Sequence, residues 1–182
     1  MYKSPNVGIF AKSNDKIVLL PHGYAETKLK KITEILEVDP IFVSIAGNRI
    51  IGPMVVINNN GMLLPSTASE DEVIYLKQVT GLNVSKLDSK LTAIGNLIST
   101  NDRGAIVSPL FKNEFDKQIG DVLGVESYTM SVADFSQTGS MIVSTNDGGA
   151  VHPKATEKEV EIISSVLKVE VEPLTINGGI PY

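Results

Sequence analysis

A proline recurs at a constant spacing of 44 residues, and this repeat constrains the fold more than any other feature of the sequence. The prolines are Pro21, Pro65, Pro109 and Pro153, and each follows a short apolar segment. The glycines that begin the units are Gly8, Gly52, Gly95 and Gly139. An Asn- or Asp-rich turn follows each glycine. We therefore expect a single repeat domain, residues 1–182, with units at about 7–50, 51–93, 94–137 and 138–182.

Each unit has the pattern of two strands, a helix and a third strand. Short apolar and β-branched segments, such as Met54 to Ile57, end at a turn whose residues tolerate positive φ, which indicates a β-hairpin. A helix is then predicted after each proline. Its signals are Ser69 with Glu72, Thr156 with Glu159 and Asn113 at N-termini, and Gly81 and Gly124 at C-termini. The pattern predicts an α/β fold of β-β-α-β repeats.

One unit of this size cannot bury both its helix and its sheet, so neighbouring units must supply the other wall of the core. The units could stack as an open solenoid or close as a ring around a central axis. A ring is favoured because no terminal unit has the polar outer face of a capping repeat. Val169 to Tyr182 is expected to be a final strand followed by a connector to another hairpin.

Composition and charge narrow the class of protein. The chain has 42% hydrophobic residues and a net charge of −5, which favour a globular fold and oppose nonspecific binding to nucleic acid. The absence of cysteine excludes disulfides, thiolate metal sites and cysteine nucleophiles. No signal peptide or long apolar run is present. We expect a cytoplasmic protein with no membrane or DNA partner. If its partner is a ribonucleoprotein, the contact is expected to be the basic protein surface of that partner.

Three long strings resemble one known family. Ser44 to Gly52, Ser89 to Pro109 and Thr145 to Thr156 are similar to the archaeal and eukaryotic translation initiation factor 6 family, the ribosome anti-association factors. The resemblance implies a pentein-type α/β propeller of five repeats that binds the large ribosomal subunit, blocks its joining to the small subunit and takes part in large-subunit maturation. Five such repeats need about 220 residues, so most of a fifth repeat is expected to be absent from these 182 residues.

The same resemblance implies a contact surface at the end of the ring where the repeat glycines and the Asn-rich turns are expected to lie together. The predicted ribosome-binding residues are Pro53, Asn58, Asn96, Asn101, Ser140 and Asn146. Their main partner is expected to be ribosomal protein, with minor contacts to ribosomal RNA from the basic run Lys28 to Lys31. A purely structural interpretation competes with this one, because turn chemistry explains the Asn clusters and close backbone approach explains the glycines.

The pentein fold also occurs in guanidine-modifying enzymes, which need a cysteine nucleophile with histidine and carboxylate partners, and this chain has no cysteine. Its histidines, His22 and His152, both adjoin a repeat-closing proline, so equivalent positions on different blades and structural roles are expected. The sequence predicts no enzyme activity, no cofactor and no metal. Two alternatives remain: a pentein small-molecule enzyme or binding protein that uses the central pore, and a repeat scaffold with no ribosomal role.

Overall fold

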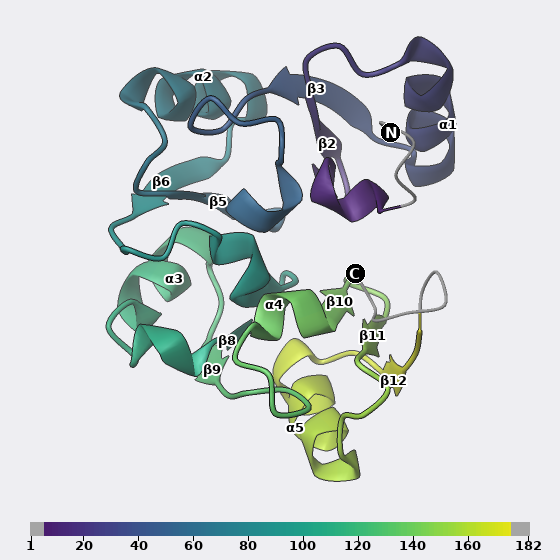
Figure 1. Cartoon of the computed structure of the whole chain (residues 1–182), viewed down its shortest axis with the longest axis vertical. Helices are drawn as coiled ribbons and strands as arrows, with labels where there is room; N and C mark the ends of the chain where they lie inside the picture. Colours follow the sequence, from purple (N-terminus) through teal and green to yellow (C-terminus); the bar gives the residue numbers. More distant parts are fainter. Residues whose placement is uncertain (1–5, 176–182) are drawn as a thin grey trace.

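In the computed structural model, which describes residues 6–175, four three-stranded sheets surround a common centre, and each sheet with its helix is called a blade (Figure 1). Blade 1 comprises β1 (Lys12–Ser13), β2 (Ile17–Pro21), α1 (Glu26–Leu36) and β3 (Asp39–Val43). Blade 2 comprises β4 (Val56–Ile57), β5 (Gly61–Pro65), α2 (Glu70–Thr80) and β6 (Asn83–Leu87). Blade 3 comprises β7 (Ile98–Thr100), β8 (Ala105–Val107), α3 (Asp116–Leu123) and β9 (Ser127–Thr129). Blade 4 comprises β10 (Ile142–Ser144), β11 (Gly149–Val151), α5 (Glu157–Leu167) and β12 (Val171–Pro173).

The blades share one topology. In each blade the first two strands are antiparallel, and the chain then crosses through the helix to add a third strand parallel to the second. Short helical segments lead into the hairpins or follow them. These are η1 (Val7–Ile9), η2 (Gly52–Met54), η3 (Ile94–Asn96), η4 (Pro109–Phe111) and α4 (Thr138–Met141). The predicted α/β fold of β-β-α-β units is therefore confirmed.

Most of the predicted helix termini are confirmed. Ser69 with Glu72 and Thr156 with Glu159 form complete capping boxes, and Gly81 and Gly124 adopt the left-handed conformation at the ends of α2 and α3.

The prediction that Asn113 caps the third helix is wrong. Pro109 begins the 3₁₀ helix η4, which is capped by the Ser108 side chain. Lys112 and Asn113 then take positive φ values of 50° and 60°, so the chain cannot continue as a helix, and α3 starts only after Phe115.

Neighbouring blades share their cores, as the repeat length requires. Val73 and Leu76 of α2 belong to one buried cluster with Leu19 of blade 1 and Leu64 of blade 2. In the same way, residues of α3 pack with the sheets of blades 2 and 3, and residues of α5 with those of blades 3 and 4. Three of the helices are therefore held between two sheets, which joins the blades through apolar contacts.

The seam between blade 4 and blade 1 differs from the other junctions. Among the buried clusters of the described residues, α1 contributes only to that of its own blade. Leu36, its last residue, is 47% exposed, whereas the equivalent Leu123 and Leu167 on α3 and α5 are buried. Val143 on β10 is also exposed. Apolar side chains thus remain uncovered on both sides of this seam.

Candidate functional site

The repeat glycines and the Asn-rich turns lie at opposite ends of the hairpins. In blade 2, η2 precedes β4 and the turn at residues 58–60 follows it, so a strand separates the two features. The other blades have the same order. The prediction that both features share one end of the ring is therefore wrong. We call one side the glycine end; it is formed by η1 to η4, α4 and the connectors that follow β3, β6 and β9. We call the other side the turn end; it is formed by residues 14–16, 58–60, 101–103 and 145–147.

The turn end is closed by a ring of side chains around the axis, one from each blade. The Asn59 Nδ2 donates to Asp15 Oδ2 at 2.7 Å and to Asp102 Oδ2 at 2.6 Å. The Asn146 Nδ2 donates to the same two oxygens, at 2.8 Å each. Carboxylates and amides thus alternate, and each carboxylate oxygen accepts two amide protons. This axial ring also links blade 4 to blade 1 across the seam.

A second layer of asparagines joins successive blades. The side-chain amides of Asn14, Asn58 and Asn101 donate to the main-chain oxygens of Asn58, Asn101 and Thr145, at 3.1, 3.1 and 3.0 Å. Asn58 and Asn101 also donate to the last carbonyl of the next blade's helix, at 2.8 Å in both cases. Thr145, at the fourth equivalent position, has no amide to donate, so the series ends at blade 4.

These bonds leave little of the turn asparagines for a partner. Asn58 and Asn101 are 3% and 4% exposed, and each side-chain oxygen accepts two main-chain N–H groups of its own turn. The turn end encloses a cavity of about 360 Å³ that the axial ring lines. Its amides and carboxylates are already bonded to one another, so an occupant would have to break those bonds.

At the glycine end the blades meet through their main chains. A Cβ added at Gly52 would lie 1.7 Å from the Gly8 oxygen, and one at Gly95 would lie 2.2 Å from the Gly52 oxygen. A Cβ at Gly139 would lie 2.5 Å from the Gly95 oxygen. Only glycine permits this approach, so the repeat glycines set the spacing between blades.

Three of the predicted contact residues lie at the glycine end. Pro53, Asn96 and Ser140 lie half-buried on η2, η3 and α4. Around them the connectors and short helices present large apolar side chains that are 37% to 46% exposed. These side chains are Val7, Ile50, Leu91, Leu110 and Phe135. The glycine end therefore combines close main-chain contacts between blades with several partly exposed apolar side chains.

Sequence reasoning missed those apolar residues because they lie in connectors. Leu91 and Phe135 are single apolar residues between polar neighbours, and Ile50 belongs to a pair of isoleucines, so helix or strand periodicity does not detect them. The usable signal is their recurrence shortly before the repeat glycines, in three successive units.

Glutamates at helix N-termini hold two of these connectors in place. Glu72 accepts from the Ala46 N–H at 3.0 Å, and Glu159 accepts from the Ala133 N–H at 2.9 Å. Desolvation acts to raise the pKa of Glu159, but hydrogen bonds from Thr156 and Ala133 outweigh it and hold that pKa below its ordinary value of 4.5. The connectors are therefore anchored to the helices behind them.

The two histidines do not form a catalytic pair, and their positions are not equivalent. His152 is buried before its proline and its Nδ1 accepts the Lys154 N–H at 3.1 Å, whereas His22 is exposed after its proline and stacks on Phe42. The expectation of equivalent positions is thus wrong. Within residues 6–175 no group of three or more His, Asp or Glu side chains is placed to hold a metal ion. No helix in that range is long and apolar enough to cross a membrane.

Solved structures share this fold at low sequence identity. A DDAH from Pseudomonas aeruginosa matches with a TM-score of 0.55 and 11% identity over 92% of this chain and 68% of that one. The N-terminal domain of ArgZ, a cyanobacterial arginine dihydrolase, matches with a TM-score of 0.53 and 11% identity over 93% and 68%. The likeness extends to the fold alone, and it defines this chain as a pentein-type α/β repeat protein.

The chain belongs to the eIF-6 family, whose model matches residues 1–182. Translation initiation factor 6 of Nitrosopumilus maritimus is 46% identical over 182 residues, which are 100% of this chain and 82% of that protein. The factor of Pyrococcus abyssi is 40% identical over 98% of this chain and 81% of its own length. Eukaryotic translation initiation factor 6 of Emericella nidulans is 34% identical over 98% and 74%. The chain is therefore a member of a family of translation factors.

Proposed function

We propose that this protein binds the large ribosomal subunit through its glycine end and prevents association with the small subunit by steric occlusion. The observation that carries the proposal is the set of partly exposed apolar side chains on the glycine end, on a chain of the eIF-6 family. Occlusion requires shape and affinity but no chemical turnover, so no catalytic group is needed. The protein acts in the cytoplasm and also takes part in large-subunit maturation.

The six predicted contact residues divide into two groups under this proposal. Pro53, Asn96 and Ser140 lie on the glycine end and touch the partner. The amides of Asn58, Asn101 and Asn146 are engaged between blades, so these residues maintain the ring that presents the glycine end. Their direct contact with the ribosome stays a prediction.

The charge of the chain favours ribosomal protein as the main partner. The chain has a net charge of −5, so the phosphate backbone of ribosomal RNA repels it and basic ribosomal proteins attract it. Lys28, Lys30 and Lys31 are exposed on α1, and Lys30 lies 3.7 Å from Glu34, so any contact of this run with RNA is minor.

Cosedimentation with purified large subunits tests the proposal, with a subunit-joining assay in parallel. We expect the wild-type chain to sediment with large subunits, to leave small subunits unbound and to suppress joining. A matched control is Asp147→Arg at the exposed turn end, which should retain both activities. Sedimentation without suppression of joining, or equal binding to both subunits, would reject the occlusion mechanism.

The cavity at the turn end supports a second candidate function, the binding of a small molecule in the pore. The mutual hydrogen bonds of the axial ring oppose it, and the absence of cysteine removes the nucleophile of the guanidine-modifying enzymes. A thermal shift with guanidino compounds that Asp102→Asn abolishes would favour this candidate over the ribosomal one.

A further inference from the structure

A pocket of about 350 Å³ opens between blade 1 and blade 2, on the rim of the glycine end. One wall is formed by His22 and the end of β3, and the other wall is formed by the first half of α2. Aromatic rings and carboxylates line it together. The lining includes His22, Phe42, Ser44, Asp71, Glu72 and Tyr75.

The rings of this pocket form a partly stacked surface. The His22 and Phe42 ring centroids are 6.3 Å apart with an interplanar angle of 29°, and Tyr75 on the opposite wall is 44% exposed. Asp71 is exposed at the same helix, and Glu72 beside it accepts main-chain N–H groups of the connector at residues 46–47. The pocket therefore combines aromatic faces with negative charge.

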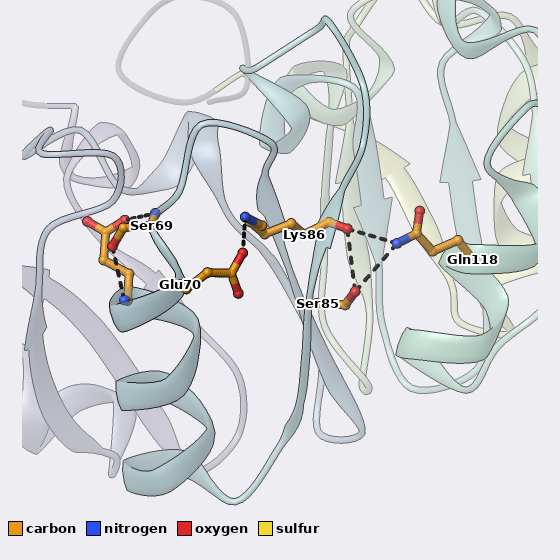
Figure 2. Close-up of polar contacts among 6 residues, drawn as sticks. Ser69, Glu70, Ser85, Lys86 and Gln118 are labelled. Atoms are coloured by element: carbon orange, nitrogen blue, oxygen red, sulfur yellow. Dashed lines mark hydrogen bonds and ion pairs between the residues drawn. The ribbon is translucent and has the colours of Figure 1, made fainter.

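Figure 2 shows the polar contacts at the junction between blades 2 and 3. There Gln118 of α3 occupies the position of Tyr75 and donates to the Lys86 carbonyl oxygen at 2.8 Å. Its amide also reaches Ser85, and the Lys86 amine pairs with Glu70. Gln118 thus bonds the edge of β6, whereas Tyr75 lines the pocket beside β3.

The third groove, between blades 3 and 4, lacks the same combination. Thr129 replaces Phe42, Lys158 replaces Asp71 and Ile162 replaces Tyr75 at the equivalent positions of the repeat. In the part of the chain that the structure describes, the groove between blades 1 and 2 alone combines an aromatic at both wall positions with a carboxylate. Its composition is therefore a local feature and does not follow from the repeat.

We infer that this pocket binds an arginine side chain, supplied by the protein on which the glycine end docks. A guanidinium is planar, weakly hydrated and always charged, so it stacks on aromatic faces while its N–H groups bond carboxylates. An anion would be repelled by Asp71 and Glu72. Because Glu72 already accepts main-chain N–H groups, Asp71 is the carboxylate that would bond the guanidinium. The identity of the partner rests on the proposed function; the preference for guanidinium rests on the pocket itself.

The rim already accommodates one guanidinium of this chain. Arg49 Nη2 donates to the main-chain oxygen of His22, and a Cβ at Gly23 would lie 3.1 Å from that nitrogen. The carboxylates of the pocket, Asp71 and Glu72, belong to the opposite wall.

Titration of the whole chain with N-acetyl-arginine amide, followed by ¹H–¹⁵N NMR, tests the inference. We expect saturable shifts confined to the lining of the pocket, with weaker binding of N-acetyl-lysine amide and none of the uncharged N-acetyl-citrulline amide. Asp71→Asn should weaken binding about 3- to 30-fold. Tyr75→Gln, which copies the junction between blades 2 and 3, should abolish it, and Glu161→Gln on α5 should leave it unchanged.

Binding to large subunits then separates the two proposals. Asp71→Asn should raise the Kd for subunits about 3- to 30-fold. If the probe gives no saturable shifts while the wild type binds subunits, the pocket inference is overturned and the proposed function stands. If the probe binds and both pocket variants keep wild-type affinity for subunits, the partner does not supply the arginine. Equal binding of the citrulline analogue would overturn the preference for guanidinium.

Discussion

The turn end and the glycine end both surround the axis of the ring, but they use their polar residues in opposite ways. At the turn end, Asn58 and Asn101 are buried and their amides bond the next blade. At the glycine end, close main-chain contacts at Gly52 and Gly95 hold the blades together, and Asn96 beside them is half-buried. The difference shows that recurrent asparagines can serve as structural links between blades, whereas the proposed partner surface lies where close main-chain contacts join them.

The largest expected effect tests whether glycine is required at the glycine end. Gly95→Ala places a Cβ 2.2 Å from the Gly52 oxygen, so main chain must move. We expect a loss of about 3 kcal/mol or more in the free energy of unfolding, and a fall in Tm of about 6 to 12 °C, measured by calorimetry. Gly8→Ala is the matched control, since a Cβ there meets nothing within 4 Å. Equal stability of the two variants would contradict the close-approach account.

The second prediction tests the structural role of the turn end. Asn101→Ala removes donors to two carbonyls and an acceptor for two N–H groups in a buried position. We expect a cost of about 2 to 3 kcal/mol in urea unfolding, because the groups left behind lose their partners. Asn96→Ala, on the half-buried surface of η3, should change stability by less than about 0.5 kcal/mol. A comparable cost at both positions would remove the distinction between the ends.

The third prediction concerns the affinity for large subunits, with stability expected to stay unchanged. Asn96→Arg puts a long charged side chain into the proposed contact surface, so the Kd for large subunits should rise at least about tenfold, equivalent to about 1.4 kcal/mol. Its urea unfolding curve should match that of the wild type. Sedimentation of Asp147→Arg supplies the control for added charge at the other end. Unchanged affinity of Asn96→Arg would exclude Asn96 from the contact surface.

The smallest expected effect is a change in stability at Glu159, which anchors the connector at Ala133 of the glycine end. Because hydrogen bonds hold the pKa of Glu159 below its unfolded value, its ionised form stabilises the fold above pH 4.5, and this contribution is lost as the pH falls through the lowered pKa. Glu159→Gln should cost less than about 1 kcal/mol at pH 7, since the carboxylate is partly exposed and solvent screens it. Urea unfolding at pH 7 and pH 3 should show the difference disappearing in acid; a difference that persists there would assign it to packing.

The repeat allowed much of the fold to be predicted from sequence. Local signals sufficed for the β-β-α-β order, the capping boxes at Ser69 and Thr156 and the left-handed glycines at 81 and 124. These features depend on residues close together in the chain. The error at Asn113 arose where Pro109 started a 3₁₀ helix that competed with the expected cap.

The candidate site could be predicted only in part, because it depends on contacts between distant residues. The sequence singled out Asn58 and Asn96 alike, as polar residues of recurrent turns, and no local signal showed that a strand would separate their ends of the ring. The axial ring joins Asp15 to Asn146, which are far apart in the chain. Its hydrogen bonds therefore depend on the closure of the ring of blades and cannot be predicted from the spacing of residues in the sequence. The aromatic pocket likewise requires Phe42 and Tyr75 to come from neighbouring blades.

Hydrogen–deuterium exchange of the protein, free and bound to purified large subunits, tests most directly whether the glycine end is the docking surface. We predict that binding protects residues 48–54, 90–97 and 134–141, which carry the connectors and short helices of the glycine end. Residues 58–60 and 101–103 should exchange equally in both states. Protection of the turn end, with unchanged exchange at the glycine end, would contradict the account.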